Sequence, residues 1–346
     1  MNNWEKRWHP LRQEWIVYAA HRNSRPWSGA SVKSTDEAPA YDPNCYLCPG
    51  NTRIHNDRNP DYKDVFIFDN DHPVVGLESP EIESNRKSAH DGLYITEKAE
   101  GIAKVVCYDP RHNVTLSDVN VTQVASVFRA WRGEMVNFQA NPRIKSALIF
   151  ENKGQVVGVS NPHPHCQIYA TDFEFQFVKK EMQSADEYKV KTGRNIFSDI
   201  IQAEQKDEIR IIAENDYAIA FIPFFARFAY EVLIFPKTKH ATLITMTDEE
   251  ILGLAIVYQE VARRYDLNYN MPFPYVLVFF QAPVDGKEYP EFHLHIHILP
   301  PLRQPGLVKF LAGPELGAGN FMADTMPEDK AAELRKVDLS LFVEAE

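Results

Sequence analysis

An internal repeat constrains the fold of this 346-residue chain more than any other feature. Residues 105–116 read Val-Val-Cys-Tyr-Asp-Pro-Arg-His-Asn-Val-Thr-Leu, and residues 232–243 read Val-Leu-Ile-Phe-Pro-Lys-Thr-Lys-His-Ala-Thr-Leu. Both segments begin with a β-rich run, continue through a proline, a basic residue and a histidine, and end in Thr-Leu. Chance recurrence explains this similarity less well than two copies of one structural unit.

A helix and further strands are predicted after each copy. Behind Asn120 and behind Thr247, apolar residues recur at the spacing of one helical face, and both residues begin a capping-box pattern. The runs 143–150 and 275–280 are rich in β-branched and aromatic residues, which predicts strands. Strand, helix, strand and a His-rich strand, present twice, predict an α+β fold of two tandem units, each an antiparallel sheet with a packed helix.

The two predicted units divide the chain near its middle. We place the first at residues 1–180 and the second at residues 181–346. The segment 173–208 is polar and charged, and we expect it to form helix that bridges the halves.

Composition excludes several classes of protein. The formal net charge of -11 disfavours a general nucleic-acid binder, because such a protein needs a basic face for the phosphates. The four cysteines do not form a secreted disulfide pattern. The N-terminus has no apolar signal region, and the longest apolar stretch, 218–235, is interrupted by Pro223, Arg227 and Glu231. We therefore expect a soluble, cytoplasmic protein without a membrane span.

Cys45 and Cys48 form a Cys-x-x-Cys turn that offers two thiolates to a tetrahedral zinc ion. Alone, the pair also fits a redox site or a knuckle of another zinc module. His163 can supply a third ligand. The fourth is expected from a strand end near it, and His112 is the best candidate in the first repeat, although a solvated turn histidine would explain His112 equally well.

His163 and His165 lie two positions apart in an extended segment, so their side chains share one face. Pro162 and Pro164 fix φ at two positions and remove two backbone donors, which stiffens the segment. A metal-binding pair or a satisfied polar pair is the ordinary explanation of such a motif. If the metal binds His163, however, His165 becomes a preorganised neutral imidazole, which is a good nucleophile toward phosphorus.

The string from Glu151 to Gln167, Glu-Asn-Lys-Gly-Gln-Val-Val-Gly-Val-Ser-Asn-Pro-His-Pro-His-Cys-Gln, resembles the active-site signature of galactose-1-phosphate uridylyltransferases, a branch of the histidine-triad superfamily. The resemblance extends from Trp8 to Lys336. It implies two tandem histidine-triad-like units, a homodimer and a structural Zn²⁺ with four protein ligands. The matching ligands are Cys45, Cys48, His112 and His163.

The resemblance also implies a covalent mechanism. His165 would attack the α-phosphorus of a nucleoside-diphosphate sugar, form a nucleotidyl-histidine and release a sugar 1-phosphate. Gln167 can donate its amide N–H to the non-bridging oxygens, Gly158 allows close backbone approach and Ser160 adds a hydroxyl donor. Hydrolases of the superfamily have a second histidine where Gln167 stands. Because a glutamine is no general acid, we expect the intermediate to be protected for transfer.

Other matching positions contact the substrates. The resemblance implies that a short basic loop holds phosphates across the dimer interface, that two segments bind ribose and uracil, and that a C-terminal segment binds the sugar phosphate. The phosphate-binding positions of the basic loop are Arg22 and Arg25. The ribose- and uracil-binding positions are Asn70, Glu151 and Asn152. The sugar-phosphate-binding positions are Lys309, Phe310 and Glu315.

A second metal site, with iron or zinc, is common in these transferases and uses one glutamate and three histidines. Glu181, His295 and His297 match three of the positions, but Phe280 stands at the fourth and cannot coordinate a metal. His240 or His293 could substitute, or the site could be empty. An alternating row of histidines on one sheet face is the simpler explanation of His293, His295 and His297.

The C-terminal match is less faithful than the catalytic strand. Pro314 stands where the family usually has a tyrosine, and a glutamine expected about six residues after Glu315 is not evident. Since these groups contact the sugar, the identity of the hexose is not decided by the sequence, and neither is that of the base. Residues 315–319, Glu-Leu-Gly-Ala-Gly, are similar to a plant-type branch that transfers adenylyl groups and acts on ADP-glucose.

The sequence therefore predicts an enzyme that exchanges UMP between UDP-glucose and galactose 1-phosphate through a uridylyl-histidine, with ping-pong kinetics. One alternative is a phosphorylase or adenylyltransferase that acts on ADP-glucose or another nucleoside-diphosphate hexose with the same histidine. A nucleotide hydrolase and a non-catalytic, zinc-stabilised nucleotide-binding protein are the others. Gln167 argues against the hydrolase, and the complete string from Asn161 to Gln167 argues against the binding protein.

Overall fold

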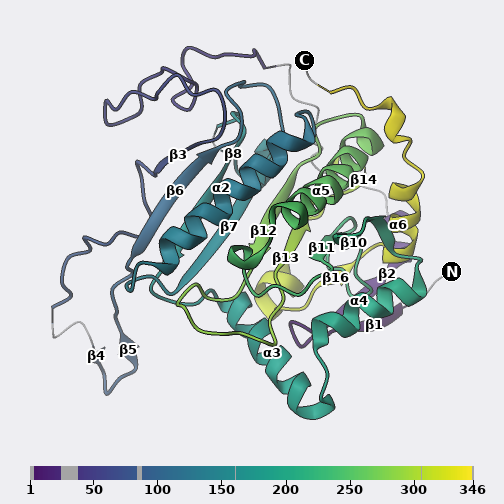
Figure 1. The fold of residues 1–346 in the computed structure, drawn as a ribbon. Helices are drawn as coiled ribbons and strands as arrows, with labels where there is room; N and C mark the ends of the chain where they lie inside the picture. The colour runs from purple at the N-terminus through teal and green to yellow at the C-terminus, as the bar shows by residue number, and fades with distance from the viewer. Residues whose placement is uncertain (1–3, 25–37, 84–87, 160, 305, 345–346) are drawn as a thin grey trace.

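One antiparallel sheet of nine strands runs through both sequence repeats (Figure 1). The computed structural model describes residues 4–24, 38–83, 88–159, 161–304 and 306–344. In their order across the sheet, the strands are β3 (Phe66–Asp69), β6 (Gly101–Cys107), β8 (His165–Thr171), β7 (Ser146–Lys153), β12 (Tyr275–Phe280), β13 (His295–Leu299), β11 (Val232–Pro236), β10 (Ala218–Phe221) and β9 (Ile211–Glu214).

The predicted duplication is visible in the strand order. In the first half β6, β8 and β7 are neighbours, and in the second half β11, β13 and β12 repeat this arrangement. The halves meet where β7 pairs with β12, with Phe150 opposite Val278. The expected α+β fold with antiparallel sheets and packed helices is confirmed. The sheets of the two halves form one continuous sheet, because the edge strands β7 and β12 pair with each other.

Two long helices cover one face of the sheet, α2 (Val121–Gln139) and α5 (Asp248–Tyr269) (Figure 1). Asn120 caps α2 by accepting the N–H of Gln123, and Thr247 with Glu250 forms the full predicted capping box of α5. In the shared core, Trp131 of α2 stacks on Phe128 at 4.8 Å and meets Phe279 of β12 edge-on at 5.0 Å.

The opposite face is covered differently in the two halves. Helices α3 (Gln176–Thr192) and α4 (Ile196–Asp207), in the bridge predicted helical, contribute Val178 and Phe197 to a second core with Phe235 and Phe280 of the second half. In the first half, by contrast, Phe150 and Gln167 on this face are partly exposed. This difference leaves room for a site on this face of the sheet in the first half.

The remaining elements are short. They are β1 (Trp4–His9), β2 (Glu14–Ala19), β4 (Ser88–Ala89), β5 (Tyr94–Ile95), β14 (Leu302–Gln304), β15 (Leu307–Val308), β16 (Met322–Ala323), α6 (Pro327–Arg335), and the short helical turns η1 (Ala20–Ser24), η2 (Gln155–Val157), η3 (Leu243–Thr245), η4 (Gly313–Gly317) and η5 (Leu339–Leu341). At β16 the chain returns to the N-terminal strands, because β16 pairs with β2, which also pairs with β1. Within the described residues, every helix is too short or too polar to cross a membrane.

Candidate active site

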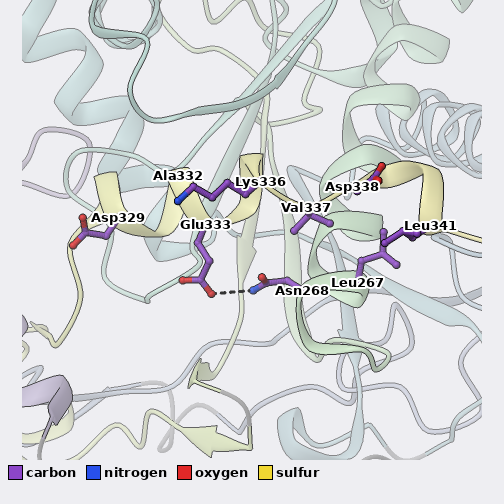
Figure 2. Close-up of a pocket in the computed structure, with 9 residues that line it drawn as sticks. All are labelled: Leu267, Asn268, Asp329, Ala332, Glu333, Lys336, Val337, Asp338 and Leu341. Carbon is purple, nitrogen blue, oxygen red and sulfur yellow. Dashed lines mark hydrogen bonds between the residues drawn. The ribbon is translucent and has the colours of Figure 1, made fainter.

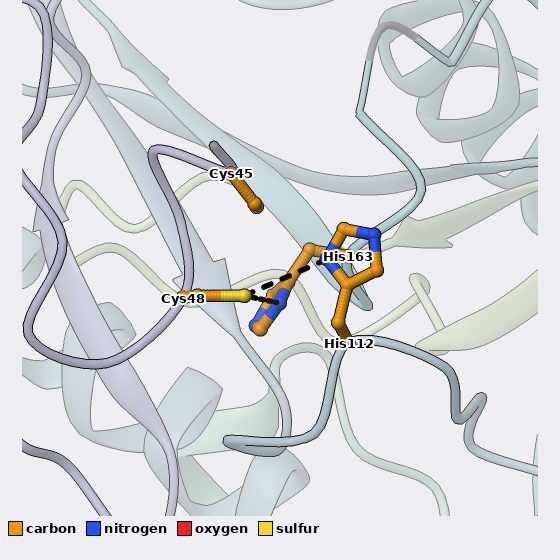
Figure 3. Close-up of side chains that lie close together, drawn as sticks. All are labelled: Cys45, Cys48, His112 and His163. Carbon is orange, nitrogen blue, oxygen red and sulfur yellow. Dashed lines mark hydrogen bonds between the residues drawn. The ribbon is translucent and has the colours of Figure 1, made fainter. Parts of the chain in front are cut away.

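The four predicted zinc ligands converge at one end of the first half (Figure 3). Cys45 and Cys48 lie on one turn, His112 follows β6, and His163 precedes β8. All four side chains are buried, and their ligand atoms lie within 4.8 Å of one another. The Sγ of Cys48 is 3.6 Å from Nδ1 of both histidines. This donor set fits a tetrahedral zinc ion.

A tyrosine that the sequence did not reveal fixes the tautomer of His163. The hydroxyl of Tyr62 donates to the carbonyl of Leu47 at 2.7 Å and lies 2.9 Å from Nε2 of His163. Because the hydroxyl proton is already committed, Nε2 must carry a hydrogen and donate it to Tyr62. The lone pair on Nδ1 then faces Cys48, as metal binding requires.

Burial favours the neutral forms of His163 and Cys48. Desolvation lowers the pKa of His163 to about 3, and desolvation likewise raises the pKa of Cys48 to about 11. A metal ion bound here would displace the proton of the Cys48 thiol and be coordinated by the resulting thiolate. Asn161 supports both sides of the site, because its Oδ1 accepts the N–H of His163 at 2.9 Å and its amide lies 3.4 Å from Sγ of Cys45.

His165 is tied directly to the metal-binding segment. It is the first residue of β8, opposite Cys107 of β6, and its Nδ1 lies 2.8 Å from the carbonyl oxygen of His163. A carbonyl can only accept, so Nδ1 carries the hydrogen. Desolvation lowers the pKa of His165, which favours the neutral ring. The lone pair is therefore on Nε2, where a nucleophile needs it.

Gln167 is held by its carbonyl oxygen. Its Oε1 accepts from Nδ2 of Asn70 and from the hydroxyl of Tyr169, both at 3.1 Å. The amide of Asn70 is itself oriented, because its Oδ1 accepts the backbone N–H of His72 at 2.8 Å. Since no described residue accepts from Nε2 of Gln167, its two N–H donors are available to a ligand. Tyr169 was missed by the sequence analysis, although it lies two positions after Gln167 on the same strand face.

A small hollow joins several of the predicted residues. It opens on the partly exposed face of β7 and β8, and Gly158, in the left-handed region with φ 84°, closes the turn η2 beside it. A side chain at this position would be strained. The hollow is lined by Phe150, Asn152, Gly158, Val159, His165, Cys166 and Gln167.

Glu151 is not part of this hollow. It alternates with Asn152 along β7 and points to the helix face, where it is buried and its Oε2 accepts from the hydroxyl of Tyr275 at 3.4 Å. Burial raises the pKa of Glu151 to about 7, while nearby Lys153 opposes the increase. The structure thus does not bring Glu151 to the surface where it was expected to contact a ligand.

The predicted phosphate-binding residues also lie elsewhere in the described structure. Lys309 and Glu315 form an ion pair at 3.4 Å, and Phe310 is about half exposed beside them. Arg22 lies 3.6 Å from Asp324. None of these side chains lines the hollow at His165. Two further predicted residues, Arg25 and Ser160, lie outside the described residues.

The predicted second metal ligands are only partly brought together. His295 Nε2 lies 3.4 Å from Glu181 Oε2, whereas His297 Nε2 lies 2.6 Å from a different carboxylate, that of Glu231. In the described part of the chain, the only group of three or more such side chains with converging ligand atoms is the Cys45 cluster.

A second surface hollow, about 780 Å³, lies between the end of α5 and α6 (Figure 2). Its lining includes Leu267, Asn268 and Glu333, and Asn268 donates to Glu333 at 3.1 Å. It contains none of the residues predicted to take part in catalysis, so the small hollow at His165 is the better candidate for chemistry.

Comparison with known proteins decides the family. Residues 1–174 match the model of the galactose-1-phosphate uridyl transferase N-terminal domain, and residues 181–345 match that of the C-terminal domain. The chain belongs to the galactose-1-phosphate uridylyltransferase family. It is 34% identical to the enzyme of that name from Haemophilus influenzae, over 95% of this chain and 93% of the relative. The Saccharomyces cerevisiae enzyme is 33% identical over 96% and 94% of the two chains.

Solved structures agree with membership of the galactose-1-phosphate uridylyltransferase family. A uridylyltransferase structure superposes with a TM-score of 0.77 at 31% identity and covers 97% of this chain and 98% of its own. An ADP-glucose phosphorylase from Arabidopsis thaliana, with bound ADP-glucose, has a TM-score of 0.76 at 21% identity, over 97% of this chain and all of its own. At that identity the second match shows the shared fold.

Proposed function

We propose that this protein exchanges UMP between UDP-glucose and galactose 1-phosphate, with His165 as the nucleophile. The observation that carries the proposal is the hydrogen bond from Nδ1 of His165 to the carbonyl of His163, which leaves the Nε2 lone pair of His165 at the hollow. Membership of the galactose-1-phosphate uridylyltransferase family supports the choice of substrates.

The first half-reaction follows from this geometry. Nε2 of His165 attacks the α-phosphorus of UDP-glucose, a P–N bond forms, and the bond to the bridging oxygen breaks, so glucose 1-phosphate leaves. The hydrogen on Nδ1 stays in place, and the carbonyl of His163 stabilises the positive charge that develops on the ring. A phosphate oxygen of galactose 1-phosphate then attacks the same phosphorus and regenerates the imidazole.

Gln167 assists through its free N–H groups. Since Asn70 and Tyr169 hold its Oε1, we propose that Nε2 donates to the non-bridging oxygens of the α-phosphate in both half-reactions. An amide cannot exchange a proton with water as a general acid would, so the intermediate persists until a sugar phosphate arrives. Ser160 is proposed as a further donor.

The Cys45 cluster is proposed to bind one Zn²⁺ through Cys45, Cys48, His112 and His163. A bound zinc ion would be structural, because all four positions are taken by protein ligands. These residues orient His163, and its carbonyl in turn orients His165. No step of the reaction requires the metal to contact phosphate.

The substrate-binding assignments that the structure does not test are proposals as well. We propose that Asn152 and Gly158 contact the nucleotide, that Lys309, Phe310 and Glu315 contact the sugar phosphate, and that Arg22 and Arg25 act across the interface of a cytoplasmic homodimer. The functional units would be residues 1–180 and 181–346.

Steady-state kinetics with paired substrates tests the proposal. With UDP-glucose and galactose 1-phosphate we expect parallel double-reciprocal lines, release of glucose 1-phosphate, and loss of turnover in His165→Gly. With ADP-glucose and inorganic phosphate we expect turnover at least about 100-fold slower, which corresponds to the discrimination that hydrogen bonds to a base can provide. Faster turnover with ADP-glucose and phosphate would instead identify a phosphorylase.

A further inference from the structure

The position of the expected second metal contains a buried arginine. The Nε of Arg12 lies 2.9 Å from Oε1 of Glu181, and both side chains are almost inaccessible to solvent, at 2% and 1% exposure. The guanidinium carbon lies 3.7 Å from the ring centroid of Phe177 and 5.0 Å from that of Phe280. A permanent positive charge thus faces the one carboxylate that a metal would need there.

Phe280 removes a second requirement of a metal site. Its ring stacks on the imidazole of His295, with centroids 5.2 Å apart and planes 8° apart. A phenyl ring offers no lone pair, and among the described residues Glu181 Oε2 and His295 Nε2, 3.4 Å apart, are the convergent ligand atoms left. Two ligands beside a guanidinium are fewer than the three or four that zinc uses in proteins.

The two histidines that could substitute, His240 and His293, cannot complete the set, because they and His297 have different partners. His297 contacts Glu231 at 2.6 Å, and His293 Nε2 lies 2.9 Å from the carbonyl of Pro236. His240 contacts Glu250 at 3.1 Å. The residues present therefore do not fit a second metal ion.

We propose that Arg12 replaces the second metal ion in this protein by neutralising Glu181 and joining the turn between β1 and β2 to α3. Neighbouring contacts support this role. The hydroxyl of Ser184, on α3, donates to the carbonyl of Leu11 at 2.9 Å, and Lys180 donates to Gln13 at 2.6 Å. The inference concerns metal content and stability, so it stands or fails independently of the proposed activity.

Metal analysis tests the first half of the proposal. The full-length protein and Glu181→Gln would each be incubated with excess Zn²⁺ or, anaerobically, with Fe²⁺, desalted, and analysed by mass spectrometry for bound metal. We expect the same metal content in both proteins, at most one equivalent per chain. Any equivalent that the wild type holds and Glu181→Gln lacks would overturn the proposal.

A double-mutant cycle tests the pairing itself. Arg12→Met leaves a buried carboxylate unpaired, and we expect the melting temperature to fall by roughly 5–10 °C, with a smaller fall in Arg12→Lys. Arg12→Met combined with Glu181→Met should recover most of the loss, because both charges are removed. Additive losses in the double variant would contradict the pairing, and if Arg12→Met does not fold, Arg12→Gln with Glu181→Gln, which also removes both charges, gives the same comparison.

Discussion

At the scale of single residues, the chemistry depends on which side-chain atoms already have hydrogen-bond partners. Nδ1 of His165 is bonded to a backbone carbonyl, and Oε1 of Gln167 accepts from two donors, so in each residue the free nitrogen is the one that chemistry requires. The residue types were predictable from the string Asn161 to Gln167. Their partners Tyr62 and Asn70 come from distant segments, and nothing in their spacing indicates these contacts.

Asn70 is expected to act by positioning Gln167. Asn70→Leu removes one donor to Oε1 and allows the amide to rotate, so we expect kcat for transfer to fall about 10-fold with little change in KM for UDP-glucose. Tyr169→Phe removes the other donor and is the matched comparison. A variant pair in which KM rises while kcat is unchanged would show ground-state binding instead.

Tyr62 is expected to tune the metal site without touching the metal. Tyr62→Phe removes the acceptor of the His163 Nε2 hydrogen and should weaken metal affinity by about 10- to 100-fold. Chelator competition with a colorimetric zinc indicator measures this. Tyr41→Phe, a substitution at an exposed hydroxyl bonded to Asn51, is a suitable control. Equal metal affinity in the wild type, Tyr62→Phe and Tyr41→Phe would show that Tyr62 does not tune the metal site.

Glu151 is expected to affect stability through its protonation. Its pKa is raised from 4.5 to about 7 by burial, so the folded state binds a proton more tightly than the unfolded state does. That contribution is complete below pH 4.5 and is lost as pH rises through 7, by about 3 kcal/mol at most. Glu151→Gln should flatten the dependence of unfolding free energy between pH 5 and 8. An unchanged slope would contradict the assignment.

At the scale of elements, the sequence patterns predicted the type of each helix or strand better than its first and last residues. The helices α2 and α5 follow their caps and periodicity, and β12 spans the predicted 275–280. The strand predicted at 143–150 is observed at Ser146–Lys153. It begins later because residues 141–144 form a turn, in which the carbonyl oxygen of Asn141 accepts the backbone N–H of Ile144 at 3.0 Å. The strand continues to Lys153 because Tyr275 pairs opposite it. Pairing between repeats cannot be derived from either repeat alone.

Removal of the metal is expected to loosen particular elements. The segments at Cys45, His112 and His163 meet at the cluster, whereas α5 and β12 lie in the apolar core. After chelation we expect faster amide exchange at 40–62 and 108–119 with α5 unchanged, measured by hydrogen–deuterium exchange mass spectrometry. Uniformly faster exchange, or none, would show that the cluster does not act as a local clamp.

At the scale of the whole molecule, the two repeats share a backbone plan and differ in what covers them. His295 repeats the contact of His165, since its Nδ1 lies 3.0 Å from the carbonyl of His293. However, His295 is completely buried among Phe197, Phe235 and Phe280, whereas His165 is partly exposed. One copy is available to a ligand, and the other stabilises the fold. The sequence indicated the duplication, whereas the packing of α3 and α4 over the second half is visible in the structure alone.

The most direct test of the central claim is to trap the intermediate. The protein would be mixed with UDP-glucose alone, quenched at alkaline pH, where a phosphorylated imidazole is expected to survive, and analysed by intact-mass and peptide mass spectrometry. We predict the added mass of one uridylyl group on the peptide containing His165, its absence in His165→Gly, and its presence in the surface control His90→Gly. A uridylyl group on another residue, or wild-type turnover by His165→Gly, would contradict the account.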